Sequence, residues 1–436
     1  MPNRPISHYS SRCRLVIYGL ILQLLVLQPL VLAQEGAERK ESTADENADT
    51  RIEAKTLAEA TTKVNEAVEQ GKVAGIAHLV FHSGKQAHYV QAGVRDIVSK
   101  EPMQRDSILR FYSMTKPITS VTAMTLFEQG KFQLDDPIAK FIPAFEKTTV
   151  FEKDADGKWQ SVPAKKLMTI RDVFRHSTGY GYGGNGIEQL EDLYVQSGVK
   201  YRSPAGMMVP LMSIEKAANQ LATIPAHHHP GERFTYGFST DLLGRLIEVW
   251  SGKALDVAMK EAVLDPLGMQ DTAFFVPEDK RDRFASCHTV SSGQLGIIDK
   301  NTTSPFADGF EFLSGGGGLL STIEDYSHFC QMMVHQGSYQ GKQVIKPETV
   351  ELMFTDQLGG VAGGFKFGLG FAIDEIELGS GDTSRKAMQY RWGGYASTDF
   401  VLVPSEKMFQ IVVRQQVPSQ HGLASELIQH VYSGVK

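Results

Sequence analysis

The amino-acid sequence predicts a two-lobe α/β (α+β) fold, in which an antiparallel sheet flanked by helices carries an inserted helical lobe. Three observations lead to this prediction. Short apolar runs bounded by turn residues indicate strands near residues 76–92, and similar runs return after residue 368. Apolar residues at helical spacing dominate the stretch between about residues 113 and 350. Because strands from both ends of a chain can join one sheet, the helical stretch is expected to form an insertion.

The amino-terminal part is expected to supply one helix and three strands. The helix is predicted over residues 51–70, where apolar side chains recur on one face. The strands are predicted at residues 76–82, 87–92 and 108–112, and the first two form a hairpin through Ser83-Gly84-Lys85.

The remaining elements follow from the same two periodicities. Helices are predicted at residues 113–130, 170–175, 215–222, 241–250 and 322–335. Strands are predicted at residues 368–373, 398–403 and 408–414, before a closing amphipathic helix at residues 423–432. The α/β lobe is therefore expected to comprise about residues 51–112 and 351–436, and the helical lobe about residues 113–350. A ligand cleft is expected between the two lobes.

The first 50 residues are expected to lie outside this domain. Residues 1–33 contain three arginines, no acid and a long apolar run, which predicts a secretory signal peptide cleaved near Ala33. Residues 34–50 are charged and almost without large apolar groups, so a disordered polar leader is expected there. The mature protein is then expected to be secreted or periplasmic. An uncleaved membrane anchor and an organelle transit peptide remain as alternatives.

Composition narrows the classes of partner. The 436 residues carry a formal net charge of −6, and removal of the predicted signal with its three arginines makes it −9. This acidity, without a basic cluster, argues against nucleic acid and anionic membranes as partners. The motifs described below, and not the composition, lead to the expectation of a small-molecule ester or amide substrate. No metal or cofactor is expected, because Cys287 and Cys330 have no metal-ligand spacing and His227-His228-His229 point to alternate faces of an extended chain. The two cysteines could pair in an oxidising compartment.

The strongest candidate for a catalytic element is Ser113-Met114-Thr115-Lys116. Residues three apart share a helix face, so the Ser113 hydroxyl and the Lys116 amine are expected to lie side by side. An amine stripped of water loses its proton readily and could activate the hydroxyl as a nucleophile. Only this pair stands at a predicted strand-to-helix junction. Three other pairs have the same spacing: Ser197–Lys200, Ser213–Lys216 and Ser433–Lys436.

Two further segments could complete such a site. A Pro-Gly turn followed by alternating aromatic residues places Tyr236 just before the predicted 241–250 helix, where a phenol held against an ammonium could carry protons. The segment Tyr390-Arg391-Trp392-Gly393-Gly394-Tyr395 contains a glycine pair that allows close backbone approach to a ligand.

Together these motifs resemble the serine β-lactamase and penicillin-binding protein superfamily. Ser113-Met114-Thr115-Lys116, then Pro230-Gly231-Glu232-Arg233-Phe234-Thr235-Tyr236, then Trp392-Gly393-Gly394 stand in the order of that superfamily's three motifs. The chain is similar to the class C β-lactamase-like branch, which includes many carboxylesterases, from about residue 55 to its end. Weaker matches lie at residues 134–137, 169–172, 176–179 and 315–322.

The resemblance implies a β-lactamase-like serine hydrolase domain over residues 51–436, with a role for each motif. Ser113 would be the acylated nucleophile, and Lys116 and Tyr236 would form the general base and acid pair. The backbone N–H groups of Ser113 and Tyr395 would form the oxyanion hole. Trp392, Gly393, Gly394 and Phe238 would contact the substrate.

Two departures from the β-lactamase pattern favour ester hydrolysis. The asparagine of the second motif is replaced by Phe238, and the lysine of the third motif is replaced by Trp392, so an amide acceptor and a cation are lost. Arg391 could restore the cation. The alternatives are a β-lactamase or D-amino-acid peptidase acting on peptidoglycan, a catalytically silent binding homologue, and acyl transfer to an alcohol or amine.

Other candidate sites have simpler interpretations. His176 could belong to a Ser-His-Asp triad, but Gly237-Phe238-Ser239-Thr240-Asp241 lacks the second glycine of a nucleophile elbow and is expected to be a helix start capped by Ser239 or Thr240. The Gly315–Gly318 run lacks the lysine of a phosphate loop and is expected to be a tight backbone passage. Tyr180 and Tyr182 could border the pocket or lie in a surface loop.

Overall fold

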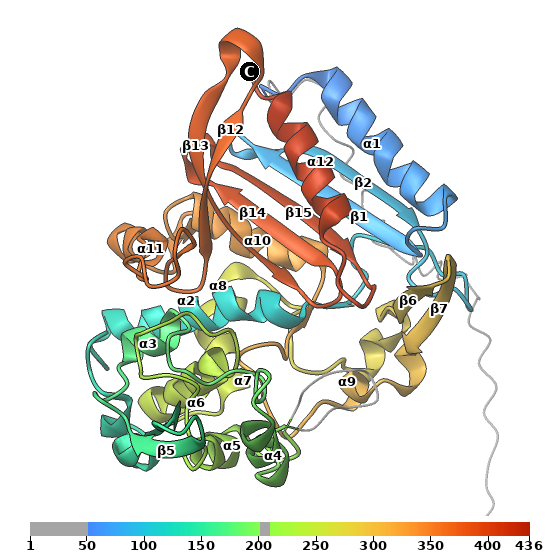
Figure 1. Ribbon diagram of the computed structural model, residues 1–436. Helices are drawn as coiled ribbons and strands as arrows, with labels where there is room; N and C mark the ends of the chain where they lie inside the picture. Colours follow the sequence, from blue (N-terminus) through green and yellow to red (C-terminus); the bar gives the residue numbers. More distant parts are fainter. Residues whose placement is uncertain (1–50, 201–209) are drawn as a thin grey trace, which may run out of the picture. The chain divides into compact units, whose positions relative to one another are not determined.

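One antiparallel sheet organises the protein in a computed structural model that describes residues 51–200 and 210–436 (Figure 1). Its strand order is β11-β12-β13-β14-β15-β1-β2, and every neighbouring pair is antiparallel. The strands are β1 (Gly75–His82), β2 (Lys85–Gly93), β11 (Lys366–Phe367), β12 (Ala372–Leu378), β13 (Arg385–Gly394), β14 (Thr398–Val403) and β15 (Met408–Arg414). The predicted signal peptide and polar leader lie outside the described residues.

The sheet joins segments from opposite parts of the sequence. β1 and β2 form the predicted hairpin, with Ile76 opposite Ala92. β1 also pairs with β15, where Ile76 lies opposite Arg414, more than 300 residues away in the sequence. All residues of β1 and β15 are buried, which explains their nearly continuous apolar sequence. The prediction that both ends of the domain build one sheet is therefore confirmed.

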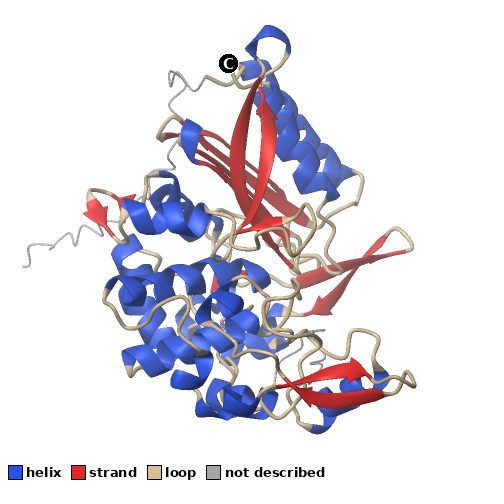
Figure 2. Cartoon of the chain, turned by 60° about the vertical axis from the view of Figure 1, so that its left-hand side comes forward, coloured by secondary structure: helices blue, strands red, loops and turns tan. Residues whose placement is uncertain are grey.

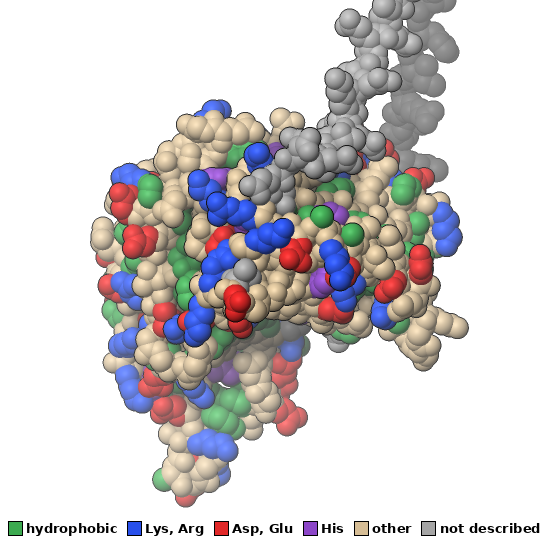
Figure 3. Space-filling model, turned by 90° about the horizontal axis from the view of Figure 1, so that it is seen from above, with side chains coloured by type: hydrophobic (Ala, Val, Ile, Leu, Met, Phe, Trp, Pro, Cys, Tyr) green, Lys and Arg blue, Asp and Glu red, His purple; other side chains and the backbone are tan. Residues whose placement is uncertain are grey.

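Helices cover both faces of the sheet (Figure 1). On one face lie α1 (Ala54–Glu69) and α12 (Gly422–Ser433), whose buried side chains form a separate apolar cluster with the sheet. Lys63 of α1 pairs with Glu426 of α12 at 2.5 Å at their exposed boundary. On the other face α10 (Ile323–Val334) packs against β14 and β15. Viewed from above, basic and acidic side chains are interspersed over the surface (Figure 3).

The helical part is arranged around α2 (Thr115–Glu128), which packs against α6 (Ser239–Ser251). Nearly every side chain of α2 is buried, including its threonines. The other helices are α3 (Ile170–Phe174), α4 (Glu188–Gln196), α5 (Ile214–Leu221), α7 (Leu255–Met259), α8 (Asp265–Leu267), α9 (Pro305–Asp308) and α11 (Pro347–Phe354). None of the helices within residues 51–200 and 210–436 is long and apolar enough to cross a membrane.

Within the described residues, four two-stranded pairs lie outside the main sheet. Figure 2 shows hairpins that stand apart from this sheet. They are β3 (Leu109–Arg110) with β8 (Leu320–Ser321), β4 (Thr149–Lys153) with β5 (Trp159–Pro163), β6 (Cys287–Ser291) with β7 (Gln294–Asp299), and β9 (Ser338–Tyr339) with β10 (Lys342–Gln343). Three of these pairs, β4–β5, β6–β7 and β9–β10, are hairpins that the sequence interpretation missed in a stretch expected to be largely helical. Their turns contain glycines with positive φ, such as Gly157 and Gly293.

Three element predictions were wrong in detail. The strand expected at residues 108–112 is only β3, because the chain turns at Tyr112 and pairs with β8 instead of the main sheet. The strand expected at residues 368–373 spans the turn between β11 and β12, where Gly370 has a φ of 105°. Neither Ser239 nor Thr240 caps α6, because the helix begins at Ser239 and Phe238 occupies the capping position. By contrast, β14 and β15 have the predicted limits.

Candidate active site

Ser113 lies at a strained turn between β3 and α2. The short 3-10 helix Tyr112–Met114 links the two elements, and Tyr112 has a φ of 43°. A bulky residue in this left-handed region costs roughly 1–3 kcal/mol, which the surrounding packing must offset. The Tyr112 ring is buried and contacts Phe306 and Tyr395 edge-on. The turn therefore holds Ser113 in a fixed position at the start of a buried helix.

Lys116 lies one turn further along and is only 1% exposed. Its ammonium group donates to Ser113 Oγ at 3.2 Å, to the Tyr182 hydroxyl at 3.2 Å and to the Gly316 carbonyl at 2.6 Å. These three oxygen atoms match the three donors of a lysine. The amine is thus fixed beside the serine hydroxyl, as the i, i+3 spacing predicts.

Tyr236 reaches the same oxygen atom from the helical part of the protein. Its hydroxyl donates to Ser113 Oγ at 2.6 Å, and its ring lies 4.5 Å from Lys116 Nζ. The preceding residue, Thr235, donates its backbone N–H to the His176 carbonyl at 2.7 Å. Ser113, Lys116 and Tyr236, which were selected from the sequence, therefore meet around one oxygen atom.

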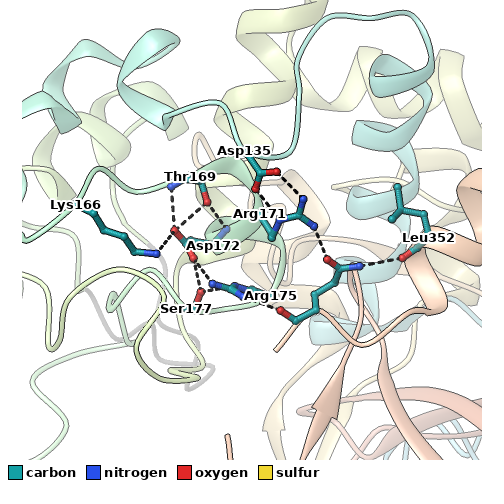
Figure 4. Close-up of polar contacts among 9 residues, drawn as sticks. Asp135, Lys166, Thr169, Arg171, Asp172, Arg175, Ser177 and Leu352 are labelled. Carbon is teal, nitrogen blue, oxygen red and sulfur yellow. Dashed lines mark hydrogen bonds and ion pairs between the residues drawn. The ribbon is translucent and has the colours of Figure 1, made fainter. Parts of the chain in front are cut away.

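A network around Asp172 holds the segment that carries Tyr236 (Figure 4). The Asp172 carboxylate accepts hydrogen bonds from Thr169 (N–H and hydroxyl), from Arg175 at 2.7 Å and from the Ser177 hydroxyl at 2.9 Å. The Ser177 carbonyl in turn accepts the Gly231 N–H at 2.7 Å. Burial would raise the pKa of Asp172, but these hydrogen bonds and the Arg175 charge outweigh it and hold that pKa below its ordinary value.

The same network ties α3 to the segment before β11. Arg171 contacts Asp135 at 2.8 Å and the Gln357 side chain at 2.6 Å, and Arg175 donates to the Gln357 carbonyl at 2.7 Å (Figure 4). The weakly matching motif residues at 134–137 and 169–172 therefore have a structural role that joins the helical part to the sheet-forming segment.

A second buried carboxylate, Asp241, lies on the other side of Lys116. It accepts hydrogen bonds from the Ser314 hydroxyl at 2.6 Å and from the Gly316 N–H at 3.0 Å. Burial raises the pKa of Asp241, although the charge of Lys116 and the two hydrogen bonds oppose the rise. Asp241 therefore helps to fix Gly316, the residue whose carbonyl accepts from Lys116.

Three members of this site were not selected from the sequence: Tyr182, Gly316 and Asp241. Burial raises the pKa of Tyr182 well above its ordinary value, and the charge of Asp241 adds to the effect, so Tyr182 stays a neutral phenol. The Gly315–Gly318 run is the expected tight passage, but its carbonyl groups serve the site. Tyr182 was considered from the sequence either as a border of the pocket or as part of a surface loop, whereas no local pattern indicated the contacts of Gly316 and Asp241, because these residues come from segments far from Lys116 in the sequence.

The third motif, Trp392-Gly393-Gly394, forms one wall of the cleft that opens beside Ser113. Trp392, Gly393 and Gly394 end β13, and Tyr395 follows in the turn with 39% exposure. A Cβ on Gly394 would lie 2.3 Å from the Phe111 carbonyl oxygen, so only glycine lets β13 lie directly against the serine segment. These four residues line a cleft of about 750 Å³ together with Ser113 and Tyr236. A cavity of about 820 Å³ between α11 and β13 contains no residue of this site.

Phe238 and Arg391, which were connected with substrate binding from the sequence, have other contacts than expected. Phe238 is 2% exposed and packs against Tyr182 and Tyr194, and it lines a small internal cavity instead of the cleft. Arg391 lines the cleft but forms an ion pair with Asp374 at 2.5 Å, so its charge is already neutralised.

The histidines have structural partners. His176 is buried against the Tyr236 ring, and burial lowers its pKa well below the ordinary value, with Lys116 adding to the effect. His227, His228 and His229 contact the Gly183 carbonyl, the Thr235 hydroxyl and the Glu152 carboxylate, respectively. Cys287 and Cys330 are buried free thiols and do not form the disulfide considered from the sequence.

The geometry has the parts needed for covalent acyl transfer. Ser113 is a hydroxyl nucleophile, and an amine and a phenol capable of carrying its proton lie within hydrogen-bond distance. The cleft beside it can admit a substrate, because Ser113 and Tyr236 both line its wall.

Comparison with known sequences gives a family match over most of the chain. The sequence profile of the family described as Beta-lactamase matches residues 60–431. An uncharacterized protein of Mycobacterium tuberculosis is 34% identical over 295 residues, which are 68% of this chain and 71% of the relative. Esterase EstB of Burkholderia gladioli is 27% identical over 358 residues, covering 77% of this chain and 85% of the relative.

Comparison with solved structures agrees with the fold. Simvastatin synthase (LovD) from Aspergillus terreus superposes with a TM-score of 0.71 at 22% sequence identity. The match covers 87% of this chain and 98% of that protein. At this level of identity the likeness supports the fold alone.

Proposed function

Because the chain belongs to the β-lactamase family, we propose that it is a serine hydrolase that cleaves carboxylic esters through an acyl-enzyme on Ser113. The observation that carries the proposal is the convergence of Lys116 and Tyr236 on Ser113 Oγ, at 3.2 and 2.6 Å. Two curated relatives are named Esterase EstB and Lovastatin esterase, the latter from Penicillium rubens, and these names support an ester substrate.

In the acylation step Ser113 Oγ attacks the ester carbonyl carbon. The new C–O bond forms as the serine O–H bond breaks, and the Lys116–Tyr236 pair, one of whose two groups is deprotonated before the step, receives the serine proton. Collapse of the tetrahedral intermediate breaks the bond to the alcohol oxygen, which takes that proton and leaves. The close proximity of Lys116 Nζ to the Tyr236 ring lets the two groups share the proton during this transfer.

In the deacylation step water replaces the alcohol. The Lys116–Tyr236 pair takes a proton from water as its oxygen attacks the acyl carbon, and returns it to Ser113 as the acid leaves. We assign the oxyanion site to the backbone N–H groups of Ser113 and Tyr395, supported by the close approach of Gly394 to the serine segment. Trp392, Gly393 and Gly394 would contact the bound ester.

The composition of the cleft favours an ester over a β-lactam or a D-peptide. Those substrates carry a carboxylate, and Arg391, a cation on the cleft wall, is already paired with Asp374. The family match nevertheless makes β-lactam or peptidoglycan-peptide hydrolysis the second candidate. Phe238 is proposed to act on substrate choice only through Tyr182, because it lies behind the cleft wall.

Steady-state kinetics with three substrates test this proposal. We expect p-nitrophenyl butyrate to be hydrolysed with a kcat/KM at least about tenfold above that for nitrocefin or an acylated D-Ala-D-Ala peptide, a difference of about 1.4 kcal/mol. A higher kcat/KM for nitrocefin or the peptide would favour the second candidate. If none of the three substrates is turned over, the remaining alternative is a catalytically silent homologue that only binds its ligand.

We also propose that the protein is exported and acts as a secreted or periplasmic enzyme. The support comes from the arginine-containing, acid-free and apolar sequence of residues 1–33. Amino-terminal sequencing of the protein purified from its native host is expected to begin near residue 34. A mature protein that begins at Met1 would contradict export by cleavage.

A further inference from the structure

The cleft that contains Ser113 continues across β13 to the start of α12. Its outer part, here called the polar trough, is lined by Asp374, Arg391, Asp399, Ser419, His421 and Ser425. Asp374 and Arg391 lie on β12 and β13, Asp399 lies on β14, and the other residues lie in or just before α12. The trough therefore presents hydrogen-bonding groups from both the sheet and the helix beside it.

The carboxylates along the cleft are paired. Asp374 pairs with Arg391 at 2.5 Å, Glu375 with Lys386 at 2.5 Å, and Asp399 with His421 at 2.7 Å. A carboxylate ligand would have to compete with these acids for cations that are already engaged. A neutral ligand with several hydroxyl groups can instead donate to and accept from the trough without displacing an ion pair.

The His421–Asp399 pair has a defined polarity. Because an ionised carboxylate can only accept, the Nδ1–H of His421 must donate to Asp399 Oδ1. Nε2 is then the ring nitrogen left to form a hydrogen bond with a ligand hydroxyl group, which can either donate or accept. The His421 side chain is 45% exposed, so a ligand in the cleft can reach it.

Gly393 keeps this pair beside the reacting centre. A Cβ at position 393 would lie 2.9 Å from Asp399 Oδ1 and 3.1 Å from His421 Cε1. Gly393 is also the neighbour of Gly394, which lies against the serine segment. The absence of a side chain at residue 393 therefore leaves room at the point where the trough meets the site of chemistry.

The opposite side of the third motif is apolar. The Trp392 ring lies 5.5 Å from the Tyr236 ring and 5.2 Å from the Phe367 ring. Phe234 and Phe365 belong to the same partly buried cluster. A hydrocarbon acyl chain is compatible with this aromatic side, whereas the polar trough supplies several hydrogen-bonding partners for hydroxyl groups.

We propose that His421 and Asp399 form a binding subsite for a polyhydroxylated alcohol, such as glycerol or a sugar, in the ester that Ser113 attacks. This inference rests on the proposed ester hydrolysis. The alcohol lies in the polar trough, and the Nε2 atom of His421 forms a hydrogen bond with one of its hydroxyl groups. After acylation, the same subsite holds the departing alcohol until it is replaced by water.

The test compares two esters that differ only in the alcohol, glycerol 1-butyrate and methyl butyrate. We expect the wild type to prefer the glycerol ester, mainly through a lower KM. In His421→Ala the ratio of kcat/KM for the glycerol ester to that for the methyl ester is expected to fall about tenfold, the usual effect of one hydrogen bond to a substrate. His421→Gln, which retains a hydrogen-bonding side chain, is expected to recover part of the ratio.

His430→Ala is the matched control. His430 lies on α12, which begins directly after His421, but it faces Glu59 of α1 at 3.3 Å, so its replacement is expected to leave the ratio at the wild-type value. An equal ratio in wild type and His421→Ala, with both esters hydrolysed, would overturn the subsite and leave the proposed hydrolase intact. A wild type that hydrolyses neither ester would overturn both.

Discussion

Asp172 and Asp241 are both buried aspartates, yet burial has opposite consequences for them. Asp172 contacts the Arg175 guanidinium directly at 2.7 Å, and its pKa is held below the ordinary value. Asp241 contacts only neutral donors, Ser314 and Gly316, and its pKa is raised by burial. Lys116, the cation whose charge opposes this rise, donates to the carbonyl of the same residue, Gly316.

The difference separates a structural region from a reactive one. Around Asp172 each charge is neutralised by its neighbour, and the result is a fixed link between α3 and the segment before β11. Around Lys116 the two opposite charges have no direct hydrogen bond to each other and are linked through the carbonyl and the N–H of Gly316, beside the serine nucleophile. Changes in the first region should therefore lower stability, and changes in the second should lower activity.

The largest effect is expected for Lys116→Ala. Loss of the amine removes one proton carrier at Ser113, so kcat for p-nitrophenyl butyrate should fall about 10³–10⁴-fold. Lys140→Ala, an exposed lysine that pairs only with Asp136, is the control and should keep wild-type kcat. A kcat within tenfold of wild type in Lys116→Ala would place the chemistry elsewhere.

Asp172→Ala is expected to destabilise the protein by about 3–5 kcal/mol, because it leaves the Arg175 guanidinium without its partner. Urea denaturation at pH 7 measures the change. Since the folded-state pKa of Asp172 is lowered, its contribution is complete above its ordinary value of 3.8 and is lost as pH falls through the lowered folded value. The difference between wild type and variant should therefore shrink below about pH 4, and a constant difference would contradict the ion pair.

Tyr236→Phe removes the second proton carrier but keeps the ring packed against His176 and Trp392. We expect kcat to fall about 10²-fold, with little change in stability. Tyr339→Phe removes a hydroxyl that accepts only from Gln340 and should change neither quantity. If both variants kept full activity, Lys116 alone would serve Ser113.

The smallest effect on kcat is expected for Asp241→Asn. This variant tests most directly the contrast between Asp172 and Asp241. Asparagine can accept the same two hydrogen bonds but removes the charge, so we expect kcat to fall about tenfold. Asp325→Asn is the matched control, since Asp325 is also buried, has a raised pKa and accepts a backbone N–H and a hydroxyl, but far from Lys116.

Stability against pH provides a second readout for the same variant. Because the folded-state pKa of Asp241 is raised, this group makes wild type less stable as pH rises from its ordinary value of 3.8 through the raised folded value. Asp241→Asn should lack that decline and be at least as stable as wild type at pH 7. Loss of both activity and stability would indicate that the carboxylate is needed for packing instead.

Local sequence patterns could predict the parts of the site that depend on short-range geometry. The i, i+3 spacing predicted the contact between Ser113 and Lys116, and the resemblance to a known motif order added Tyr236. Tyr182, Gly316 and Asp241 could not be predicted, because their contacts arise where separate segments pack around Lys116.

The same distinction applies to the fold. β14 and β15 are continuous apolar runs and have the predicted limits, and the hairpin of β1 and β2 is also as expected. β3 was predicted too long, since its partner strand, β8, is only two residues long and lies more than 200 residues away. The strand predicted at residues 368–373 is largely a turn, in which Gly370 has a φ of 105°.

The proposed function requires that Ser113 becomes acylated during turnover. The most direct measurement is intact-mass spectrometry of the protein after reaction with a fluorophosphonate, followed by peptide mapping of the adduct. We predict a single adduct on Ser113, absent from Ser113→Ala. If the wild type carries no adduct, or carries it on another residue, Ser113 is not the nucleophile.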